Sequence, residues 1–451
     1  MKSIGVISSY LLLIAALPSA LAAPTASKTQ VGLAKNETYS DFLFILAEHE
    51  KRSLEEVIDE MGLEHTKTTT FGTHMRGFSI SLPESHAHDI ASLENVAFMQ
   101  RNYKRSGPLV KSKYKARDMA SSAKFTLSKR QADAMIEQST APWGLERISQ
   151  KGKIQLEDRK PEDLFFKYHF DRLSGDGVDV YSIDSGINID HVDFNGRAKM
   201  IFTAFGDDGK DDHGHGTHTA GIIGSLTYGV AKNVNIFGCK VLDKSNFGSD
   251  AGIVAGIDAA FTSHMKRKED PNFKGSVMNM SLGGPELSPA MSDILRRALN
   301  AGMHIVVASG NEATDACASN PGRLSLQLPI INVSASDITD NRWTNSNFGK
   351  CVTVHAPGVA IISTWNTGPR AVMQFDGTSM AAPHVAGVIA DLLARNPALK
   401  LDPKGMKELL LSKSLKDGVM GMDRVIPGGN FLLNTGVEDM MPAKASNSTK
   451  S

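Results

Sequence analysis

The sequence is short of cysteine, of net charge and of long apolar runs, and each shortage excludes a class of protein. Its 451 residues include three cysteines, so at most one intramolecular disulfide can form. Basic and acidic residues balance at 49 each, without a basic stripe, so we expect no nucleic-acid partner. Beyond the N-terminus, no segment approaches the ~20 apolar residues that a membrane-spanning helix needs.

The first residues have the pattern of a secretory signal peptide. Lys2 precedes an apolar run from about Ile4 to Leu17, and Ala20 and Ala22 supply small residues at the −3 and −1 positions of a cleavage site. We therefore predict a signal peptide over residues 1–22. Its removal would leave a protein with no membrane segment that has entered the secretory pathway.

After residue 134, the sequence alternates between apolar strands and helical stretches. The expected strands are 177–183, 235–241, 277–281, 304–308, 330–334 and 352–356. The expected helices are 251–264, 289–301, 379–396 and 404–411. This alternation predicts an α/β fold with a mainly parallel sheet and helices on both faces, and the 41% hydrophobic content suffices for a large core.

A serine stands at the start of one expected helix. Residues 377–387 read Gly-Thr-Ser-Met-Ala-Ala-Pro-His-Val-Ala-Gly, and Pro383 is tolerable in a first turn. Ser379 would lie where backbone N–H groups are unpaired and the helix dipole is positive, which favours an oxyanion beside it. A capping serine would explain this residue alone equally well.

Two earlier segments supply the partners of a nucleophilic serine. The strand 177–183 leads into Asp184, and the glycine-rich stretch 211–221 carries His215 at a helix start. A serine hydroxyl needs a base, and an imidazole base needs a buried carboxylate that fixes its tautomer. The chain order Asp184, His215, Ser379 is the order found in subtilisin, not in chymotrypsin or the α/β-hydrolases.

These three segments resemble the signatures of subtilisin-like serine proteases. The motifs are Asp184-Ser185-Gly186, 215–218 (His-Gly-Thr-His) and 377–383, separated by 31 residues (215 − 184) and 164 residues (379 − 215), which is typical of that family. Residues 141–148 resemble the fungal proteinase K-like branch, and region 166–197 looks most like vacuolar cerevisin-type enzymes. The resemblance implies a subtilisin-like three-layer fold and a serine endopeptidase that hydrolyses peptide bonds.

The resemblance also assigns an oxyanion hole and substrate contacts. Asn311 follows strand 304–308 and matches the asparagine that binds the oxyanion together with the Ser379 N–H. Six residues would contact an extended peptide: Ser281, Leu282, Gly283, Ala308, Ser309 and Gly310. Their small, uncharged walls favour large apolar residues before the cut and broad specificity. On the opposite edge, Asn246 and Phe247 depart from the family pattern and leave the width of the outer subsites open.

Zinc binding is an alternative role for the histidines. His213, His215 and His218 are close in sequence, although no carboxylate or cysteine lies at a fitting helical offset. We expect no metal ion and no cofactor, with His218 and His384 as packed structural histidines. Three acidic residues are expected to be solvated loop carboxylates: Asp193, Asp211 and Asp212.

Two alternative functions remain beside a broad endopeptidase. A kexin-like, more selective processing protease would need acidic pocket walls and a second β-domain after the catalytic unit, and we expect neither. A non-catalytic binding protein that kept the fold would show an altered triad, whereas all three residues are present.

The region before residue 134 has a different character. Residues 39–104 alternate strand-like and helix-like pieces, which predicts a small α+β module, plausibly βαββαβ, that resembles the inhibitory pro-domain of the family. Residues 105–133 are basic and polar, as expected of a cleavable linker, and Lys129-Arg130 is a candidate convertase site beside self-cleavage. We predict a propeptide over 23–133, a peptidase domain over 134–435 and a disordered tail over 436–451.

The cysteines and glycosylation sequons give further predictions. Cys317 and Cys351 flank the strand-end region of the expected oxyanion hole, so we predict that they form the disulfide. Cys239 falls in an apolar strand and is expected as a buried thiol. The glycosylation candidates are Asn36 and Asn447, because the sequons at 279 and 332 fall in expected core strands.

Calcium binding is predicted to be weak or absent. Proteinase K relatives often hold calcium with an aspartate where this chain has Thr353. Loss of a carboxylate removes most of the attraction for this hard cation.

The sequence thus predicts a monomeric serine endopeptidase made as an autoinhibited zymogen. Its partners are polypeptide substrates and its own pro-domain, which acts as inhibitor and folding aid. We favour a vacuolar location, with secretion from the cell as the alternative. The physiological substrates and the pro-domain cleavage site between about 104 and 141 stay open.

Overall fold

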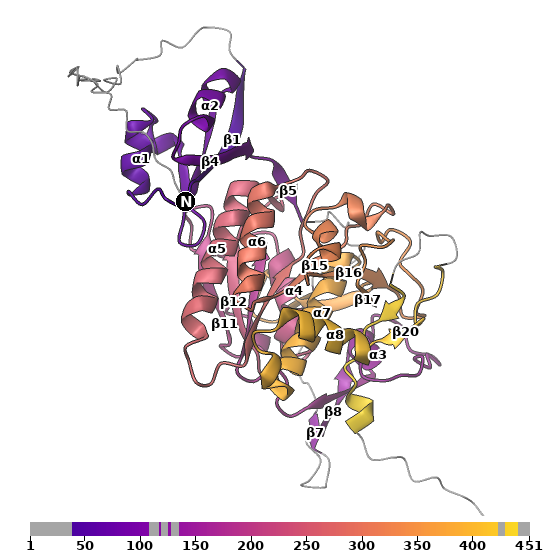
Figure 1. Ribbon diagram of the computed structural model, residues 1–451. Coiled ribbons are helices and arrows are strands. Elements are labelled where there is room, and N and C mark those ends of the chain that lie inside the picture. The colour runs from indigo at the N-terminus through magenta and orange to yellow at the C-terminus, as the bar shows by residue number, and fades with distance from the viewer. Residues whose placement is uncertain (1–37, 108–116, 119–124, 128–134, 423–428, 441–451) are drawn as a thin grey trace, which may run out of the picture. The chain divides into compact units, whose positions relative to one another are not determined.

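The computed structural model describes residues 38–107, 117–118, 125–127, 135–422 and 429–440, all within one compact unit that begins at Thr38 (Figure 1). The predicted signal peptide, the Lys129-Arg130 pair, Asn36 and Asn447 lie outside the described residues. Within those ranges, no helix is both long and apolar enough to cross a membrane.

A nine-stranded sheet is the centre of the larger domain in the described part of the chain. Its spatial order is β11 (Ala198–Thr203), β12 (Asn235–Lys240), β10 (Val178–Asp184), β14 (Gly275–Met280), β15 (His304–Ala308), β16 (Ile331–Ser336), β17 (Val354–Pro357), β21 (Phe431–Leu432) and β20 (Leu415–Lys416). Neighbouring strands pair in parallel except β20, which runs antiparallel to β21. The carboxyl ends of the parallel strands therefore share one edge, where ligand sites usually form.

Helices cover both faces of this sheet. On one face α5 (Asp250–Arg267) and α6 (Pro289–Asn300) lie side by side (Figure 1) and bury their apolar residues against β10, β12, β14 and β15. On the other face lie α4 (His215–Gly224), α7 (Thr378–Arg395) and α8 (Pro403–Lys413), with the short α3 (Trp143–Ile148) beside β17. The predicted α/β architecture of three layers, a mainly parallel sheet with helices on both faces, is confirmed.

The helix boundaries follow local sequence signals. Ser249 caps α5 by accepting the Gly252 N–H, and Ser288 caps α6 by accepting the Met291 N–H. Helix α7 has no side-chain cap and is buried from Thr378 to Ala394, as expected of a helix that is apolar on all sides. The sequence predicted these helices but ended α5 about one turn early, at 264, because the charged last turn resembles a loop.

The N-terminal module, residues 38–107, has its own sheet and core. Its elements are β1 (Tyr39–Leu46), α1 (Leu54–Glu60), β2 (Thr69–Phe71), β3 (Gly77–Pro83), α2 (Glu84–Ala91) and β4 (Val96–Arg101). The sheet order is β2-β3-β1-β4, and Phe42, Phe44 and Phe78 pack between it and the two helices. The order of elements is the predicted βαββαβ.

The segment predicted as an irregular linker contains short strands. β5 (Lys104–Ser106) pairs with β13 (Phe247–Ser249), β6 (Arg117–Asp118) with β19 (Ala371–Phe375), and β7 (Phe125–Leu127) with β8 (Met135–Ala141). In turn β19 pairs with β18 (Ile361–Thr364), and β8 pairs with β9 (Phe166–Asp171). Polar composition misled the prediction because strand edges of the larger domain supply the partners, which local sequence does not show.

The described structure also extends past the predicted boundary at 435. Residues Val437–Met440 form a 3₁₀ turn. The Lys151 N–H donates to Glu438 at 2.6 Å and the Lys151 ammonium pairs with Asp439. These contacts hold the first residues of the predicted tail against the larger domain.

Candidate active site

Asp184 and His215 form a buried pair at the carboxyl edge of the sheet. Asp184 is the last residue of β10, and His215 is the first residue of α4. His215 Nδ1 lies 2.7 Å from Asp184 Oδ1, and the side chains are 7% and 1% exposed. Asp184 also accepts the Ser185 N–H at 2.8 Å and the Thr219 hydroxyl at 3.2 Å. An ionised Asp184 therefore holds the imidazole proton on Nδ1, while Nε2 is buried with no hydrogen-bond partner in the structure.

The electrostatics of His215 differ from those of its neighbouring histidines. Burial acts to lower the pKa of His215, but the charge of Asp184 and their hydrogen bond outweigh burial and raise this pKa above its ordinary 6.5. Burial lowers the pKa of His218 to about 3 and the pKa of His384 to about 4. Of these three histidines, only the one bound to Asp184 has its pKa raised, because a nearby negative charge favours the protonated imidazole.

Ser379 lies in the first turn of α7, which packs against α4. Its hydroxyl donates to the carbonyl of Ser281 at 3.2 Å, and the Ser281 hydroxyl donates to the carbonyl of Ser379 at 3.0 Å. In this conformation the Ser379 hydroxyl is bonded to Ser281 and not to His215. The reciprocal pair fixes the first turn of α7 against the end of β14.

Asn311 is oriented by the residue that precedes Ser379. Its Oδ1 accepts the Thr378 N–H at 2.9 Å and the Thr378 hydroxyl at 2.8 Å. These bonds turn the Asn311 amide nitrogen away from Thr378, and it is buried without a partner in the structure. A buried amide donor without a partner is costly, so it is suited to an oxygen that arrives with a ligand.

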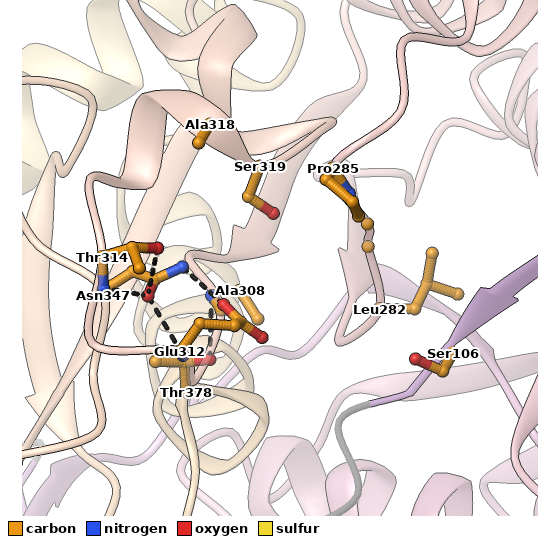
Figure 2. Close-up of a pocket in the computed structure, with 13 residues that line it drawn as sticks. Ser106, Leu282, Pro285, Ala308, Glu312, Thr314, Ala318, Ser319, Asn347 and Thr378 are labelled. Carbon is orange, nitrogen blue, oxygen red and sulfur yellow. Dashed lines mark hydrogen bonds between the residues drawn. The ribbon is translucent and has the colours of Figure 1, made fainter.

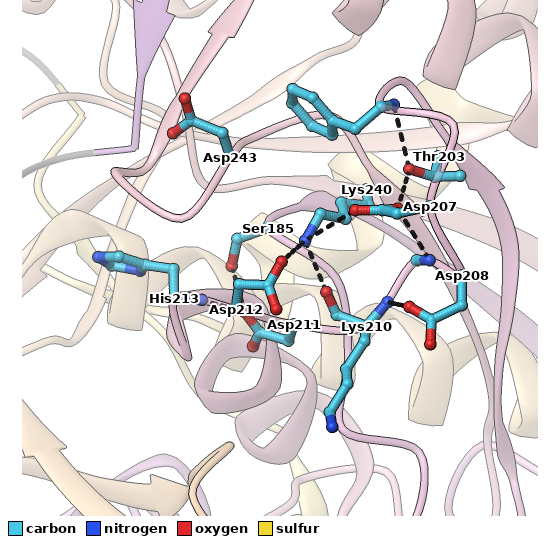
Figure 3. A network of polar contacts seen from close by, with 12 residues as sticks. Ser185, Thr203, Asp207, Asp208, Lys210, Asp211, Asp212, His213, Lys240 and Asp243 are labelled. Atoms are coloured by element: carbon cyan, nitrogen blue, oxygen red, sulfur yellow. Dashed lines mark hydrogen bonds and ion pairs between the residues drawn. The ribbon is translucent and has the colours of Figure 1, made fainter.

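Asp211 is buried and belongs to the framework of the site, so its prediction as a solvated loop residue is wrong (Figure 3). It accepts the Ser185 hydroxyl at 2.9 Å, the Gly214 N–H at 2.7 Å, and the N–H and hydroxyl of Thr217 at 2.8 and 2.5 Å. The Ser185 hydroxyl in turn accepts the Gly216 N–H at 3.0 Å. Asp211 therefore ties the residue after Asp184 to the first turn of α4, because the unpaired N–H groups there require an acceptor.

The other two acidic residues of that prediction differ from each other. Asp193 is 1% exposed and accepts the N–H and hydroxyl of Thr227, each at 2.8 Å, which corrects the prediction for this residue too. Asp212 is exposed and pairs with the buried ammonium of Lys240 at 2.8 Å, beside the Lys210 carbonyl at 2.6 Å (Figure 3). Thr227 and Lys240 thus supply donors that the local sequence around these two carboxylates did not indicate.

A cavity of about 210 Å³ is lined in part by Thr378, the residue before Ser379 (Figure 2). Four of the six predicted substrate-contact residues line it, Leu282, Gly283, Ala308 and Gly310. The predicted Ser281 and Ser309 are fully buried and do not line the cavity. Gly310 has φ +103°, and a Cβ there would lie 2.4 Å from side-chain atoms of Asn347 and Glu312, so this wall requires glycine.

Glu312 is a lining residue that the sequence argument missed. Its carboxylate accepts the Asn347 amide N–H at 2.7 Å, and Figure 2 shows both side chains on the opposite side of the cavity from Leu282 and Ser106. The sequence signal for it was an acidic residue directly after Asn311. Because Glu312 lines the cavity, the prediction of uncharged walls is wrong.

Strand β5 of the N-terminal module lies along the approach to the cavity. It pairs antiparallel with β13, and on its other side Ser106 bridges Gly283, whose N–H donates to the Ser106 carbonyl at 3.4 Å. The Gly107 N–H donates to the Asn246 carbonyl at 3.0 Å. A segment of the chain thus fills a groove between two strand edges, as an added peptide strand does.

The remaining predicted residues are placed as follows. Cys317 and Cys351 are joined by a disulfide, and Cys239 is a buried free thiol in β12. His218 Nε2 faces the carbonyls of Ile361 and Met373 at 3.2 and 3.1 Å. Over the described ranges, no three His, Cys, Asp or Glu side chains converge in an arrangement that could hold a metal ion. Thr353 accepts the Asn332 N–H at 3.2 Å.

Fold and site together define an α/β protein with a buried Asp–His pair, a serine at a helix start and an unpaired amide donor, next to a cavity that Gly310 and Thr378 help to line. Residues 175–435 match the model of the subtilase family of S8 peptidases. The chain belongs to the subtilase family.

Individual relatives agree with this assignment. Alkaline protease 2 of Aspergillus fumigatus is 41% identical over 294 residues, 62% of this chain and 57% of that protein. The subtilase-type proteinase psp3 of Schizosaccharomyces pombe is 40% identical over 294 residues, 65% of this chain and 62% of that protein. The chain thus spans less than two thirds of the length of these relatives. The crystal structure of a cold-adapted subtilisin-like serine proteinase is 38% identical with a TM-score of 0.57, covering 66% of this chain and 99% of that one.

Proposed function

We propose that this protein is a serine endopeptidase in which Ser379, His215 and Asp184 form the catalytic triad. The observation that carries the proposal is the His215–Asp184 pair at 2.7 Å, whose free Nε2 is buried with no other partner in the structure. An imidazole held in this tautomer is a base awaiting a proton donor. The names of the relatives, alkaline protease and subtilase-type proteinase, support hydrolysis of peptide bonds.

The proposed reaction starts when the Ser379 hydroxyl turns from the Ser281 carbonyl to His215 Nε2. His215 takes the proton as Ser379 Oγ attacks the peptide carbonyl, and Asp184 stabilises the imidazolium. The negative charge that forms on the carbonyl oxygen would be bound by the Asn311 amide and the Ser379 N–H. His215 then returns the proton to the leaving amine, and water releases the acyl group by the same route.

The cavity lined by Leu282, Ala308 and Gly310 is proposed to take the side chain before the cut. Its apolar surfaces support a preference for large apolar side chains and broad specificity. The carboxylate of Glu312, at the wall of this cavity, would also attract a basic side chain.

The N-terminal module is proposed to act as an intramolecular inhibitor and folding aid. β5 occupies the groove between β13 and Gly283 and contributes Ser106 to the lining of the cavity, which supports a role in keeping substrates out. The module also contacts α5, because the Asp258 carboxylate accepts the N–H groups of Thr73 and His74, each at 2.7 Å. These contacts support a zymogen state of the whole chain, which cleavage after the module would end.

The sequence supports a route through the secretory pathway, and we propose that the protein is a monomer. The apolar run 4–17 with small residues at 20 and 22 has the pattern of a signal peptide. We propose a vacuolar destination, with secretion as the alternative. Immunolocalisation of the Ser379→Ala protein, together with its sedimentation mass, tests both statements.

Expression of the wild type and Ser379→Ala side by side tests the catalytic proposal. We expect the wild type to lose its N-terminal module and cleave casein, while the variant keeps the module and is inactive. Gel mass and N-terminal sequencing of both proteins distinguish the outcomes. A folded wild type that never cleaves casein would overturn the proposal, and equal processing of both proteins would overturn self-maturation alone.

A further inference from the structure

Arg105 and Asp250 form a fully buried ion pair between β5 and the start of α5. Arg105 Nε lies 2.6 Å from Asp250 Oδ1 and Nη2 lies 3.0 Å from Oδ2. Both side chains are 0% exposed. This two-point geometry matches a planar guanidinium, whereas a lysine ammonium would present a single point of charge.

The pocket around Arg105 has further features that suit a long cationic side chain. Arg105 Nη1 donates to the Glu286 carbonyl at 2.9 Å and lies 3.3 Å from Glu286 Oε2. A Cβ at Gly284 would lie 2.9 Å from Arg105 Nη1, so the absence of a side chain there makes room for the guanidinium. The pocket is thus shaped as well as charged for arginine.

Asp250 is a carboxylate that needs a cation in this position. Burial raises its pKa, although the hydrogen bonds and charge of Arg105 act to lower it. A buried carboxylate is expensive unless a partner neutralises it. Whatever polypeptide lies along this groove therefore gains affinity by placing a positive charge beside Asp250.

The pairing of β5 gives the position of this pocket relative to the serine. β5 pairs with β13 through Arg105 and Gly248, and Ser106 lies opposite Gly283 in antiparallel register. Moving back two positions from Gly283 to Ser281 (283 − 281) moves a bound peptide forward two positions. The peptide residue opposite Ser281 is then three positions after the residue that occupies the position of Arg105. Because the Ser281 carbonyl accepts the Ser379 hydroxyl, we take the residue opposite Ser281 as the one directly before the cut, so the residue at the Arg105 position is the fourth before it.

We propose that Asp250, with Glu286 and Gly284, forms a substrate subsite that selects arginine at the fourth residue before the scissile bond. This inference rests on the proposed peptidase function, and it makes the protease more selective than the apolar cavity alone suggests. Arg105 of the N-terminal module occupies the subsite as the arginine of a substrate would. The opposing possibility is that the pair only docks the module and has no part in substrate choice.

Four internally quenched peptides test the subsite with the matured wild type. They are identical, with phenylalanine before the cut, and carry arginine, lysine, citrulline or leucine at the fourth position. Citrulline keeps the shape of arginine without its charge. We expect kcat/KM to be about 10- to 100-fold higher for arginine than for citrulline or leucine, with lysine between.

Variants then assign the preference to Asp250. Asp250→Asn should reduce the arginine-to-citrulline ratio of kcat/KM to about one to three. Asp250→Lys should favour a fifth peptide of the same design, with glutamate at the fourth position, over the arginine peptide. The matched control is Glu269→Gln, an exposed carboxylate just beyond the far end of α5, which should keep the wild-type ratio. If an Asp250 variant does not mature, the wild-type peptide series decides alone.

The outcomes separate the two proposals. Equal cleavage of all four peptides by the wild type overturns the arginine subsite and leaves the peptidase function standing. Cleavage of none of them or of casein overturns both. A preference for arginine that persists in Asp250→Asn overturns the assignment to this residue.

Discussion

Thr378 donates both its N–H and its hydroxyl to Asn311 Oδ1, at 2.9 and 2.8 Å. The residue before the proposed nucleophile thereby fixes the orientation of the proposed oxyanion donor. Asn311 lies in the loop after β15 and Ser379 lies in α7, so a side-chain contact is needed to keep the two donors in register. Since preorganised donors contribute most of the stabilisation of a charged transition state, this contact should affect turnover.

Replacing Thr378 by valine should lower kcat about tenfold with KM changed less than about twofold, because one of the two bonds that hold Asn311 is lost. Thr378→Ser keeps the hydroxyl and should restore most of the activity. Asn311→Ala should reduce kcat about 10²–10³-fold, the loss known for the corresponding subtilisin asparagine. Adding Thr378→Val to Asn311→Ala should then have little further effect. Steady-state kinetics on one peptide compares the four variants with the wild type, and additive losses would show that Thr378 acts independently of Asn311.

The acid limb of the activity profile should report His215. The base must be neutral to accept a proton, so activity falls as the pH drops through the pKa of His215. Asp184 raises that pKa above 6.5 despite burial, which places the limb above the ordinary histidine range. Asp184→Asn removes the charge, so the limb should shift to lower pH while kcat falls by roughly 10⁴-fold. The pH dependence of kcat/KM measures both, and a wild-type limb below 6.5 would contradict the assignment.

The sequence predicted the elements and motifs of the site because each proposed role requires one residue type at the end of one element. Asp184 ends a strand, while His215 and Ser379 begin helices, and these patterns are local. The order of elements in the N-terminal module follows from alternation in the same way. The three-layer fold likewise follows from regular alternation of strands and helices.

The relationships that the sequence could not give are those between distant segments. Arg105 and Asp250 are 145 residues apart, and nothing local to either one indicates a buried partner. Asp211 looked like a loop carboxylate although four of its five donors lie within six residues of it; the fifth, the Ser185 hydroxyl, reaches it only when the turn after β10 packs against this loop. Short strands in the supposed linker form for the same reason, since their partners belong to other parts of the chain.

Asp211 should contribute to stability as well as to the placement of His215. Asp211→Ala leaves several buried donors without an acceptor, so we expect a loss of about 2–4 kcal/mol in the free energy of unfolding. Asp208→Asn, in the exposed part of the same loop, should change it by less than about 0.5 kcal/mol. Urea unfolding in the Ser379→Ala background, where self-digestion is absent, measures both. Equal stability of the two variants would show that Asp211 is replaceable by water.

Glu312 should tune cleavage after basic residues. Its side chain is exposed at the cavity wall and held by the Asn347 amide at 2.7 Å, so its attraction for a cationic side chain is screened by solvent. Glu312→Gln keeps the shape and should reduce kcat/KM for a lysine peptide about two- to fivefold relative to a phenylalanine peptide. The reduction should shrink in 1 M salt, because screening weakens exposed pairs most. A salt-independent change in the ratio, or a loss shared equally by both peptides, would mean that Glu312 supports the wall through Asn347 rather than attracting the substrate's charge.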